Sequence, residues 1–264
     1  MSPREILAVF DDERRMLGPA GYRLEQTERL TRSIPLDGGW GWIAWSAHDA
    51  AGLDDAIATE IVHFTSLGCS FEWKVYDHDR PADLRQRLGA RGFHVGPMEA
   101  FLVLPTRDLM EPTVVASDSI DVRRMNSVEE FEDYLTLERI VWPERDATLH
   151  VDSRRRFREY REEVSYYVAY AEGQPVSSAR VDFRKGSRFA GLYGGATLEA
   201  FRGRGFYTAL VAARGNEARE RGAEFLTVDA LPTSRPILER RGFQCLSRTY
   251  PCTWTVAATA PSQM

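Results

Sequence analysis

A repeated segment closes each half of the chain and constrains the fold more than any other feature of the sequence. Leu88-Gly-Ala-Arg-Gly-Phe93 matches Leu238-Glu-Arg-Arg-Gly-Phe243, with the same offset at every matched position. A proline, Pro81 or Pro236, stands near the expected start of the helix that ends in each match. The glycine is typical of a helix that ends in a left-handed residue, after which the phenylalanine packs back on a sheet. We therefore expect one supersecondary unit to occur twice.

Strand-like runs flank both copies in the same order. Residues 71–76 and 225–229 precede the two helices, and residues 100–104 and 253–256 follow the two Gly-Phe turns. Because runs rich in aromatic and β-branched residues favour strands, each half contains the series strand, helix, turn, strand. The shared order favours a tandem duplication over a chance similarity between two helix ends.

The second half contains further elements ahead of its repeated unit. Ser127 and Glu130 form a capping-box pattern at the start of an amphipathic helix. An arginine-rich helix is expected over residues 153–163, and a helix from residue 206 or 207 to about 221 follows a glycine-rich loop. Between them a meander of three strands is expected at 165–171, 176–183 and 188–197. The apolar face of the first helix comprises Phe131, Tyr134, Leu135, Leu137 and Ile140.

The sequence predicts two domains. Residues 105–119 contain two prolines and no sustained periodicity, which is typical of a linker. A chain of 264 residues exceeds the common domain size of roughly 100 to 150 residues. We therefore expect one domain over residues 1–112 and a second over residues 119–264. Their strands and helices predict the α/β class, with a mixed central sheet flanked by helices in each domain.

The composition is that of a soluble globular protein, with 43% hydrophobic and 28% charged residues. The net charge of −5 gives no general attraction to nucleic acid or anionic membrane, so neither is an expected partner. No apolar run approaches the roughly 20 residues that cross a bilayer, and the first residues lack a charged and apolar leader. We therefore expect a cytoplasmic protein. The preference for arginine over lysine is typical of a GC-rich bacterial genome.

No metal site is predicted. The three cysteines are widely spaced and form no CxxC pair, so neither zinc nor a disulfide framework is indicated. Asp77-His78-Asp79 consists of metal-ligand types, but adjacent strand residues point to opposite faces. A turn is the preferred interpretation of this tripeptide.

The loop Arg202-Gly-Arg-Gly-Phe-Tyr207 lies between a predicted strand and a predicted amphipathic helix. Its glycines allow successive backbone N–H groups to point into one cavity, and the helix N-terminus adds a partial positive charge. Together with Arg202 and Arg204, this main chain is suited to a pyrophosphate group. The alternative is a tight turn with solvated arginines. No Gly-Lys-Ser/Thr follows, and no GxGxxG follows a first strand, so neither an ATP site nor an NAD site is indicated.

With this loop, the second half resembles the GNAT superfamily of acyl-CoA-dependent N-acetyltransferases. The family motif, Arg/Gln-x-x-Gly-x-Gly/Ala at the start of its third helix, is matched at Arg202 and Gly205, whereas Tyr207 replaces the final small residue. The order of elements from about residue 120 to 256 also follows the family. Residues 38–64 of the first half look like the corresponding strand and helix without such a loop. We therefore expect a degenerate GNAT-like copy there, with no CoA site.

The resemblance implies that acetyl-CoA is the co-substrate. Its pyrophosphate would lie on the backbone amides of residues 203–207, and its pantetheine arm would pair like an extra strand with the main chain of residues 196–198. The residues so assigned to acetyl-CoA are Ala196, Thr197, Leu198, Arg202, Gly203, Arg204, Gly205, Phe206 and Tyr207.

Two side chains that many family members use in catalysis are absent. The strand before the loop has no carboxylate in Leu192-Tyr-Gly-Gly195, and Leu238 stands where the family often has a tyrosine that protonates the thiolate. The catalytic candidates are therefore Asp229, as a base at the end of its strand, and Tyr193, facing the cleft. Asp182 on the adjacent strand is a further candidate. The alternatives are packing for Tyr193, a cap for Asp229 and simple solvation for Asp182.

We expect an enzyme that transfers an acetyl group from acetyl-CoA to a primary amine of a small molecule or peptide. The alternative is an acyl-CoA-binding regulatory or scaffold protein of the same fold, with weak or no activity. The sequence identifies neither the acceptor amine nor the choice between a monomer and a homodimer. The first half is expected to act structurally by covering one edge of the sheet in the second half.

Overall fold

The computed structural model describes residues 1–36, 38–110, 120–143 and 147–256. The chain divides into two compact units. Unit 1 comprises Met1–Glu99 and Ser247–Met264, and unit 2 comprises Ala100–Leu246. The predicted mixed α/β class is confirmed. Across the described ranges, no helix combines the length and the apolar character needed to cross a bilayer.

The sheet of unit 2 has the strand order β6-β11-β10-β9-β8-β7. Neighbouring strands are antiparallel, except for β10 and β11, which run parallel. The predicted meander of three strands is confirmed as β8, β9 and β10. The strands are β6 (Glu99–Pro105), β7 (Asp121–Arg124), β8 (Val164–Ala171), β9 (Gln174–Phe183), β10 (Phe189–Thr197) and β11 (Phe225–Ala230).

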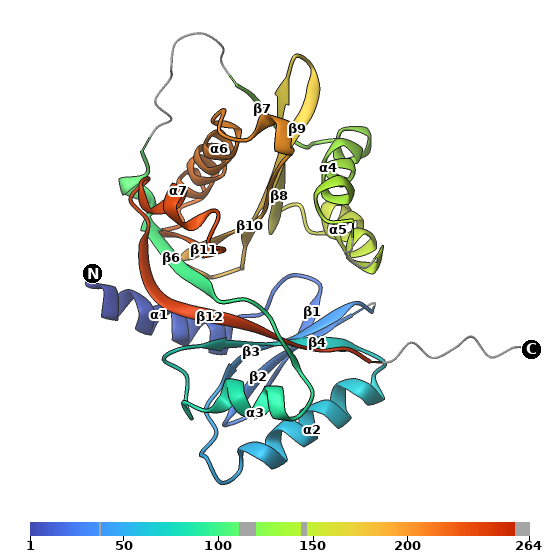
Figure 1. The fold of residues 1–264 in the computed structure, drawn as a ribbon, viewed down its shortest axis with the longest axis vertical. Coiled ribbons are helices and arrows are strands. Elements are labelled where there is room, and N and C mark those ends of the chain that lie inside the picture. The colour runs from blue at the N-terminus through green and yellow to red at the C-terminus, as the bar shows by residue number, and fades with distance from the viewer. Residues whose placement is uncertain (37, 111–119, 144–146, 257–264) are drawn as a thin grey trace, which may run out of the picture. The chain divides into compact units, whose positions relative to one another are not determined.

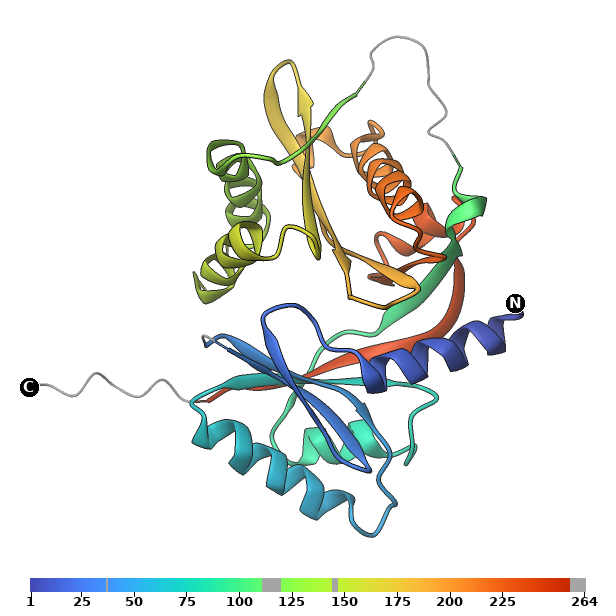
Figure 2. The ribbon, with the colours of Figure 1, turned by 180° about the vertical axis from the view of Figure 1, so that it is seen from behind.

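Helices cover both faces of this sheet, as Figures 1 and 2 show. One face carries α4 (Val128–Val141) and α5 (Ala147–Glu159), and the other carries α6 (Phe206–Glu220) and α7 (Arg235–Glu239). The capping box predicted at the start of α4 is present, with the Ser127 hydroxyl accepting from the Glu130 backbone N–H. The helix α5 begins earlier than the predicted residue 153. Two short 3₁₀ helices, Thr106–Asp108 and Glu199–Phe201, complete the unit.

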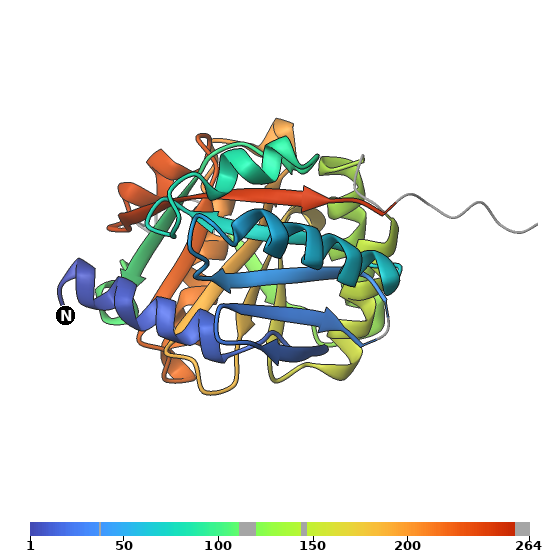
Figure 3. The same ribbon diagram turned by 90° about the horizontal axis from the view of Figure 1, so that it is seen from below.

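Unit 1 repeats this plan with the strand order β1-β2-β3-β4-β12, and the short β5 pairs with β12. As in unit 2, one neighbouring pair, β3 and β4, is parallel. Helices α2 and α3 lie on one face of these strands (Figure 3), and α1 packs against β2 and β3. The helices are α1 (Pro3–Met16), α2 (Leu53–Ser66) and α3 (Leu84–Ala90); the strands are β1 (Tyr22–Gln26), β2 (Leu30–Pro35), β3 (Trp40–Ser46), β4 (Ser70–Tyr76), β5 (His94–Val95) and β12 (Gln244–Trp254).

The repeated segment forms the predicted structure in both units. Gly92 follows α3 with a φ of 94°, and Gly242 follows α7 with a φ of 93°. Phe93 and Phe243 behind them are buried in the cores of their units. The left-handed glycine releases the chain from the helix, and the phenylalanine fixes the turn on the sheet. The duplicated supersecondary unit is therefore confirmed.

The strands that follow the two Gly-Phe turns are exchanged between the halves of the chain. β6 follows the turn of the first half but pairs with β11 over residues 225–230, so it covers one edge of β11, as expected for the first half. β12 follows the turn of the second half, and its end pairs with β4. In Figure 1 the green β6 accordingly lies among orange elements, and the red β12 lies beside β4.

The observed division of the chain therefore differs from the predicted domains, residues 1–112 and 119–264. The reason is that hydrogen bonds between distant segments decide which sheet a strand joins, and the local sequence pattern does not encode that choice. Of the predicted linker at residues 105–119, residues 111–119 lie outside the described residues. Its first residues have regular structure instead, because Pro105 ends β6 and Thr106–Asp108 form a 3₁₀ helix.

Candidate active site

The two parallel strands of unit 2 part from each other midway along their length. β10 and β11 pair only through residues 189–191 and 225–227. Beyond this point β10 stays paired with β9 up to Thr197, and β11 stays paired with β6 up to Ala230. Among the described strands, none pairs with the edge of β10 that faces β11 after Gly191, up to the end of β10 at Thr197. This edge leads directly into the loop that the sequence assigns to acetyl-CoA.

A β-bulge interrupts β10 where the strands part. The register against β9 shifts between Tyr193 and Ala196, so Gly194 and Gly195 lie opposite one residue of β9. Gly194 has a φ of 60°, a conformation that residues with a side chain rarely adopt. Since the extra residue of a bulge is left out of the ladder, its backbone groups can turn toward a ligand.

Both glycines of the predicted CoA loop adopt left-handed conformations. The φ angle is 73° at Gly203 and 90° at Gly205, and Gly205 is the N-cap of α6. No side chain caps α6, so the first N–H groups of the helix are not satisfied by a side chain of the loop. The loop residues 202–205 are exposed, whereas Phe206 is buried in the core. The loop therefore presents backbone donors at its surface.

The arginines of the loop lie beside these donors. The Nε of Arg202 donates to the carbonyl of Thr197 at 3.3 Å. The guanidinium of Arg204 lies 5.1 Å from the centroid of the Phe201 ring. Both side chains are thereby held near the start of α6, where they add positive charge to the helix dipole.

The three residues assigned to the pantetheine arm lie at the end of β10. Ala196 is buried, whereas Thr197 and Leu198 are half-buried. Two hydrogen bonds tie this segment to β9: the Ala196 carbonyl accepts from the Ser177 hydroxyl, and the Leu198 N–H donates to the Val176 carbonyl at 2.9 Å. The structure places all three next to the opening between β10 and β11.

Tyr207, the departure from the family motif, packs against the bulge. A methyl group built on Gly195 would lie 2.7 Å from the Tyr207 ring, so the ring fills the space above this glycine. Burial raises the pKa of the Tyr207 hydroxyl, which also hydrogen-bonds with Ser234. The large side chain of Tyr207 is thus accommodated at the third motif position because Gly195, the residue beside it on β10, has no side chain.

Tyr193 and Asp229 point to the same face of the sheet. Their neighbours Leu192 and Val228 pack into the core under α6, and alternate strand residues point to opposite faces. Both candidates therefore point toward the face that carries α4 and α5. Burial raises the pKa of the Tyr193 hydroxyl, and the nearby carboxylate of Asp229 adds to this shift. The structure brings the two predicted catalytic residues onto opposite sides of the opening.

Asp182 forms ion pairs, whereas the alternative offered in the sequence analysis was a solvated strand residue. Its carboxylate pairs with Arg156 at 2.8 Å and with Arg180 at 3.1 Å. Burial alone would raise the pKa of Asp182, but the two guanidinium groups outweigh burial and lower it. Asp182 is thus engaged in a buried ion-pair network and is a weaker base than an unpaired carboxylate.

Sequence reasoning missed a carboxylate of α4 that faces the bulge. Glu138 is only 5% exposed. A methyl group built on Gly194 would lie 3.6 Å from the Glu138 Oε1 and 3.1 Å from the Tyr134 hydroxyl. The sequence could have indicated Glu138, because it lies on the apolar face predicted for this helix. Ile140, which we expected on that face, is 59% exposed instead.

Arg214 of α6 was also missed. It is 1% exposed and lies one helical turn from Leu210 and from Ala218, both of which belong to the core. Its guanidinium hydrogen-bonds with the backbone of β9 and β10 beside the bulge. A charged residue on the buried face of the predicted helix was again the available signal.

Leu238, at the position of the missing tyrosine, is fully buried in the core of unit 2.

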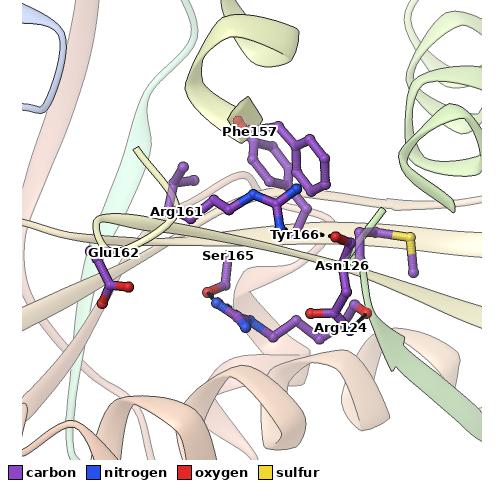
Figure 4. A pocket seen from close by; sticks show the side chains of 9 residues that line it. Arg124, Asn126, Phe157, Arg161, Glu162, Ser165 and Tyr166 are labelled. Atoms are coloured by element: carbon purple, nitrogen blue, oxygen red, sulfur yellow. Dashed lines mark hydrogen bonds between the residues drawn. The ribbon is translucent and has the colours of Figure 1, made fainter. Parts of the chain in front are cut away.

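A cavity of about 150 Å³ elsewhere in this unit is lined by Arg124, Arg161 and Ser165, among others (Figure 4). It lies where β8 begins and includes none of the predicted site residues. In the described part of the chain, no three His, Cys, Asp or Glu residues come together in a way that could hold a metal ion.

Known acetyltransferases resemble this chain in sequence and in structure. The model of the acetyltransferase (GNAT) family matches residues 130–243. A GCN5-related N-acetyltransferase from Kribbella flavida is similar in structure, with a TM-score of 0.70 and 17% identity over 96% of this chain and 95% of that chain. No curated protein matches the sequence at a significant level.

Two further solved structures are similar over most of the chain. A functionally unknown conserved protein from Staphylococcus epidermidis has a TM-score of 0.65 and 16% identity, over 92% of this chain and 96% of that chain. A tandem GNAT protein from the clavulanic acid biosynthesis pathway has a TM-score of 0.57 and 15% identity, over 92% of this chain and 86% of that chain. The similarity in fold thus extends over both units of the chain.

Proposed function

Because residues 130–243 match the model of the acetyltransferase (GNAT) family, we propose that the protein transfers an acetyl group from acetyl-CoA to a primary amine of a small molecule or peptide. The observation that carries this proposal is the opening between β10 and β11, which leads into an uncapped helix start. The family supports an acyl-CoA-dependent acyltransferase in general. The acetyl group, the primary amine and the roles of single residues are our proposal.

The loop before α6 fits the pyrophosphate of CoA. Gly203 and Gly205 hold conformations that only glycine adopts readily, so the N–H groups of residues 203–207 are free of side-chain obstruction. Arg202 and Arg204 and the positive end of the α6 dipole favour an anion there. We assign the pyrophosphate to this loop and the pantetheine arm to the open edge of β10 at residues 196–198.

The same geometry supports a role for the β10 main chain in polarising the thioester. A bulge interrupts the regular ladder of β10, so backbone N–H groups there are available as fixed donors, and fixed donors stabilise negative charge that develops on a carbonyl oxygen. Tyr193 and the N-terminus of α6 are the groups that we assign to assisting departure of the thiolate, because Leu238 offers no acid.

An amine must lose its proton to attack the thioester carbon. We assign this step to Asp229, directly or through water, because it lies on the strand that borders the opening and points to the same face as Tyr193. Glu138 is the second carboxylate on that face and competes for the role. Asn at position 229 and Gln at position 138 keep the shape of each side chain while removing its charge, so Asp229→Asn and Glu138→Gln discriminate between the two.

The alternative is an acyl-CoA-binding scaffold or regulator with little or no turnover. The observation in its favour is that the usual strand carboxylate and the usual tyrosine acid are both absent, with Leu192 and Leu238 buried. Binding of CoA is common to both proposals. Only the rate of acetyl transfer distinguishes them.

A CoA-release assay with acetyl-CoA and a panel of small-molecule and peptide primary amines tests the proposal. We expect release of free CoA that depends on one class of amine, and an acetylated product of the same amount by mass spectrometry. The matched control is Asp229→Asn, which is expected to bind acetyl-CoA normally and to release it slowly. Binding of acetyl-CoA without acetyl transfer to any amine of the panel would favour the scaffold alternative.

A further inference from the structure

The side chain of Arg214 lies under the bulge of β10. It is 1% exposed, and its Nε donates to the carbonyl of Leu210 at 2.9 Å within its own helix. Its Nη1 donates to the carbonyls of Arg180 at 3.0 Å and Tyr193 at 3.3 Å. Because these two residues are the last ladder pair before the bulge, Arg214 holds the backbone of β9 and β10 together where the regular pairing is interrupted.

Arg214 differs from other buried arginines of the chain in having no acidic partner. Among the residues that the structure describes, no carboxylate forms an ion pair with it, and its hydrogen bonds go to backbone carbonyls. Burial lowers the pKa of its guanidinium to about 10, which still leaves it charged near neutral pH. A neutral side chain could donate to the same carbonyls without the penalty of a buried charge. The charge itself therefore calls for an explanation.

The bulge of unit 1 supplies an internal comparison. The pairing of β2 with β3 is also shifted, so that Ala44 is the extra residue of β3. Arg14 of α1, 3% exposed, donates to the Ala44 carbonyl at 3.0 Å. There the guanidinium is neutralised by ion pairs with Asp79 and Asp11. A buried arginine thus supports a bulge in both units, but its charge is left uncompensated only in unit 2.

The carbonyl of Tyr193 and the N–H of Gly194 belong to one peptide group. A donor on a peptide carbonyl polarises the group and strengthens its N–H as a donor, since hydrogen bonds in a chain reinforce one another. Gly194 is part of the bulge, where the N–H is free to leave the ladder. A fixed positive charge in a site of low dielectric also acts on a nearby developing negative charge much more strongly than it would in water.

On this basis, and resting on the proposed function, we propose that Arg214 is a positioning residue that acts through the Tyr193–Gly194 peptide to polarise the thioester carbonyl. In the reaction the amine nitrogen bonds to the thioester carbon and gives its proton to Asp229, directly or through water. The carbon–sulfur bond breaks, and sulfur leaves with the bonding electrons as the thiolate of CoA. Negative charge passes through the carbonyl oxygen during this exchange. Arg214 stabilises that charge without touching the substrate.

Two substitutions separate the charge from the hydrogen bonds. Arg214→Lys keeps a positive charge under the bulge, whereas Arg214→Gln keeps a donor and removes the charge. Arg221→Gln is the matched control, because Arg221, the residue after α6, also donates to a backbone carbonyl, that of Glu162 at 2.7 Å, away from the bulge. A structural role alone would make both variants at position 214 less stable without altering the electronic state of bound acetyl-CoA.

The test is the infrared carbonyl stretch of acetyl-CoA carrying ¹³C at the thioester carbon, bound to the full chain. We expect a lower wavenumber in the wild type than in free acetyl-CoA, most of this shift retained in Arg214→Lys and in Arg221→Gln, and most of it lost in Arg214→Gln. The kcat of Arg214→Gln should fall by roughly tenfold to a hundredfold, while the KM for acetyl-CoA changes little.

An unshifted stretch in the wild type, or the same shift in folded Arg214→Gln, would overturn the inference. If Arg214→Gln does not fold, the wild-type spectrum and the retained shift in Arg214→Lys decide the question. Failure of the proposed function has a different signature, because a wild-type chain that binds no acetyl-CoA in calorimetry contradicts that proposal before any spectrum is measured.

Discussion

The loops that follow the parallel strands β3 and β10 differ in charge and in glycine conformation. After β10, two left-handed glycines and two arginines lead into α6, and no side chain caps the helix. After β3, the Asp49 carboxylate accepts from the Gly52 N–H at 2.7 Å, and Asp54 and Asp55 occupy the first turn of α2. Carboxylates of the chain itself therefore stand in unit 1 where unit 2 presents donors and positive charge.

We interpret this difference as one fold present in two copies, of which only unit 2 has kept a loop suited to the proposed ligand. Both units retain a parallel strand pair, a bulge supported by a buried arginine and a helix that ends in a Gly-Phe turn. The core needs all of these features. Since an anion is bound by the loop, a few acidic residues there would oppose its binding in unit 1 without disturbing the sheet.

The largest expected effect is on a fragment of residues 119–264. This fragment lacks β6, so the edge of β11 that pairs with β6 over residues 225–230 becomes open, and the core loses Leu102 and Leu104. An open strand edge beside exposed apolar surface favours aggregation. We expect the fragment to aggregate or to bind acetyl-CoA weakly in calorimetry. Co-expression with residues 1–118 should restore a soluble complex that binds, whereas full acetyl transfer by the fragment alone would contradict the strand exchange.

Asp79→Ala tests the neutralised arginine of unit 1. The side chains of Arg14 and Asp79 are each only 4% exposed, and the substitution leaves Asp11 as the remaining partner of a buried charge. Removing one partner of a buried pair typically destabilises by roughly 3–5 kcal/mol. We expect a loss near this range in urea unfolding. Asp83→Ala, which breaks an exposed pair with Arg87, is the control and should change stability little. Equal effects of the two would mean that the unit 1 bulge does not depend on charge compensation.

Asp229→Asn addresses the chemistry that only unit 2 is proposed to perform. We expect kcat to fall by at least about a hundredfold, a common contribution of a general base, with the affinity for acetyl-CoA maintained. Tyr193→Phe should have a smaller effect, because burial raises the pKa of its hydroxyl and makes it a weak acid, so that the hydroxyl orients water without giving up its proton. A normal kcat in Asp229→Asn, together with a slow Glu138→Gln, would transfer the role to Glu138.

Gly205→Glu gives the loop of unit 2 an acidic residue at the start of its helix, as in unit 1. The left-handed φ of 90° opposes any side chain at a cost of roughly 1–2 kcal/mol, and the new carboxylate repels phosphate. The Kd for acetyl-CoA should rise roughly fivefold to thirtyfold by this strain alone, and binding is expected to disappear when repulsion is added. Gly52→Glu, at the start of α2, is the matched control and should leave the affinity unchanged.

Local patterns in the sequence predicted most elements of the fold and the position of the loop. The capping box at Ser127 and the Gly-Phe turns depend on neighbouring residues, so the sequence encodes them locally. The exchange of β6 and β12 depends on pairing between distant strands, which no local pattern specifies. Glu138 and Arg214 escaped notice because a charged residue on a helix suggests a solvated face until packing shows it to be buried.

Titration calorimetry of acetyl-CoA into the full chain tests most directly that one unit has kept the ligand and the other has lost it. The account predicts one binding event per chain, which is lost in Gly205→Glu and retained in Gly52→Glu. Two sites per chain, or one site that survives Gly205→Glu, would contradict it.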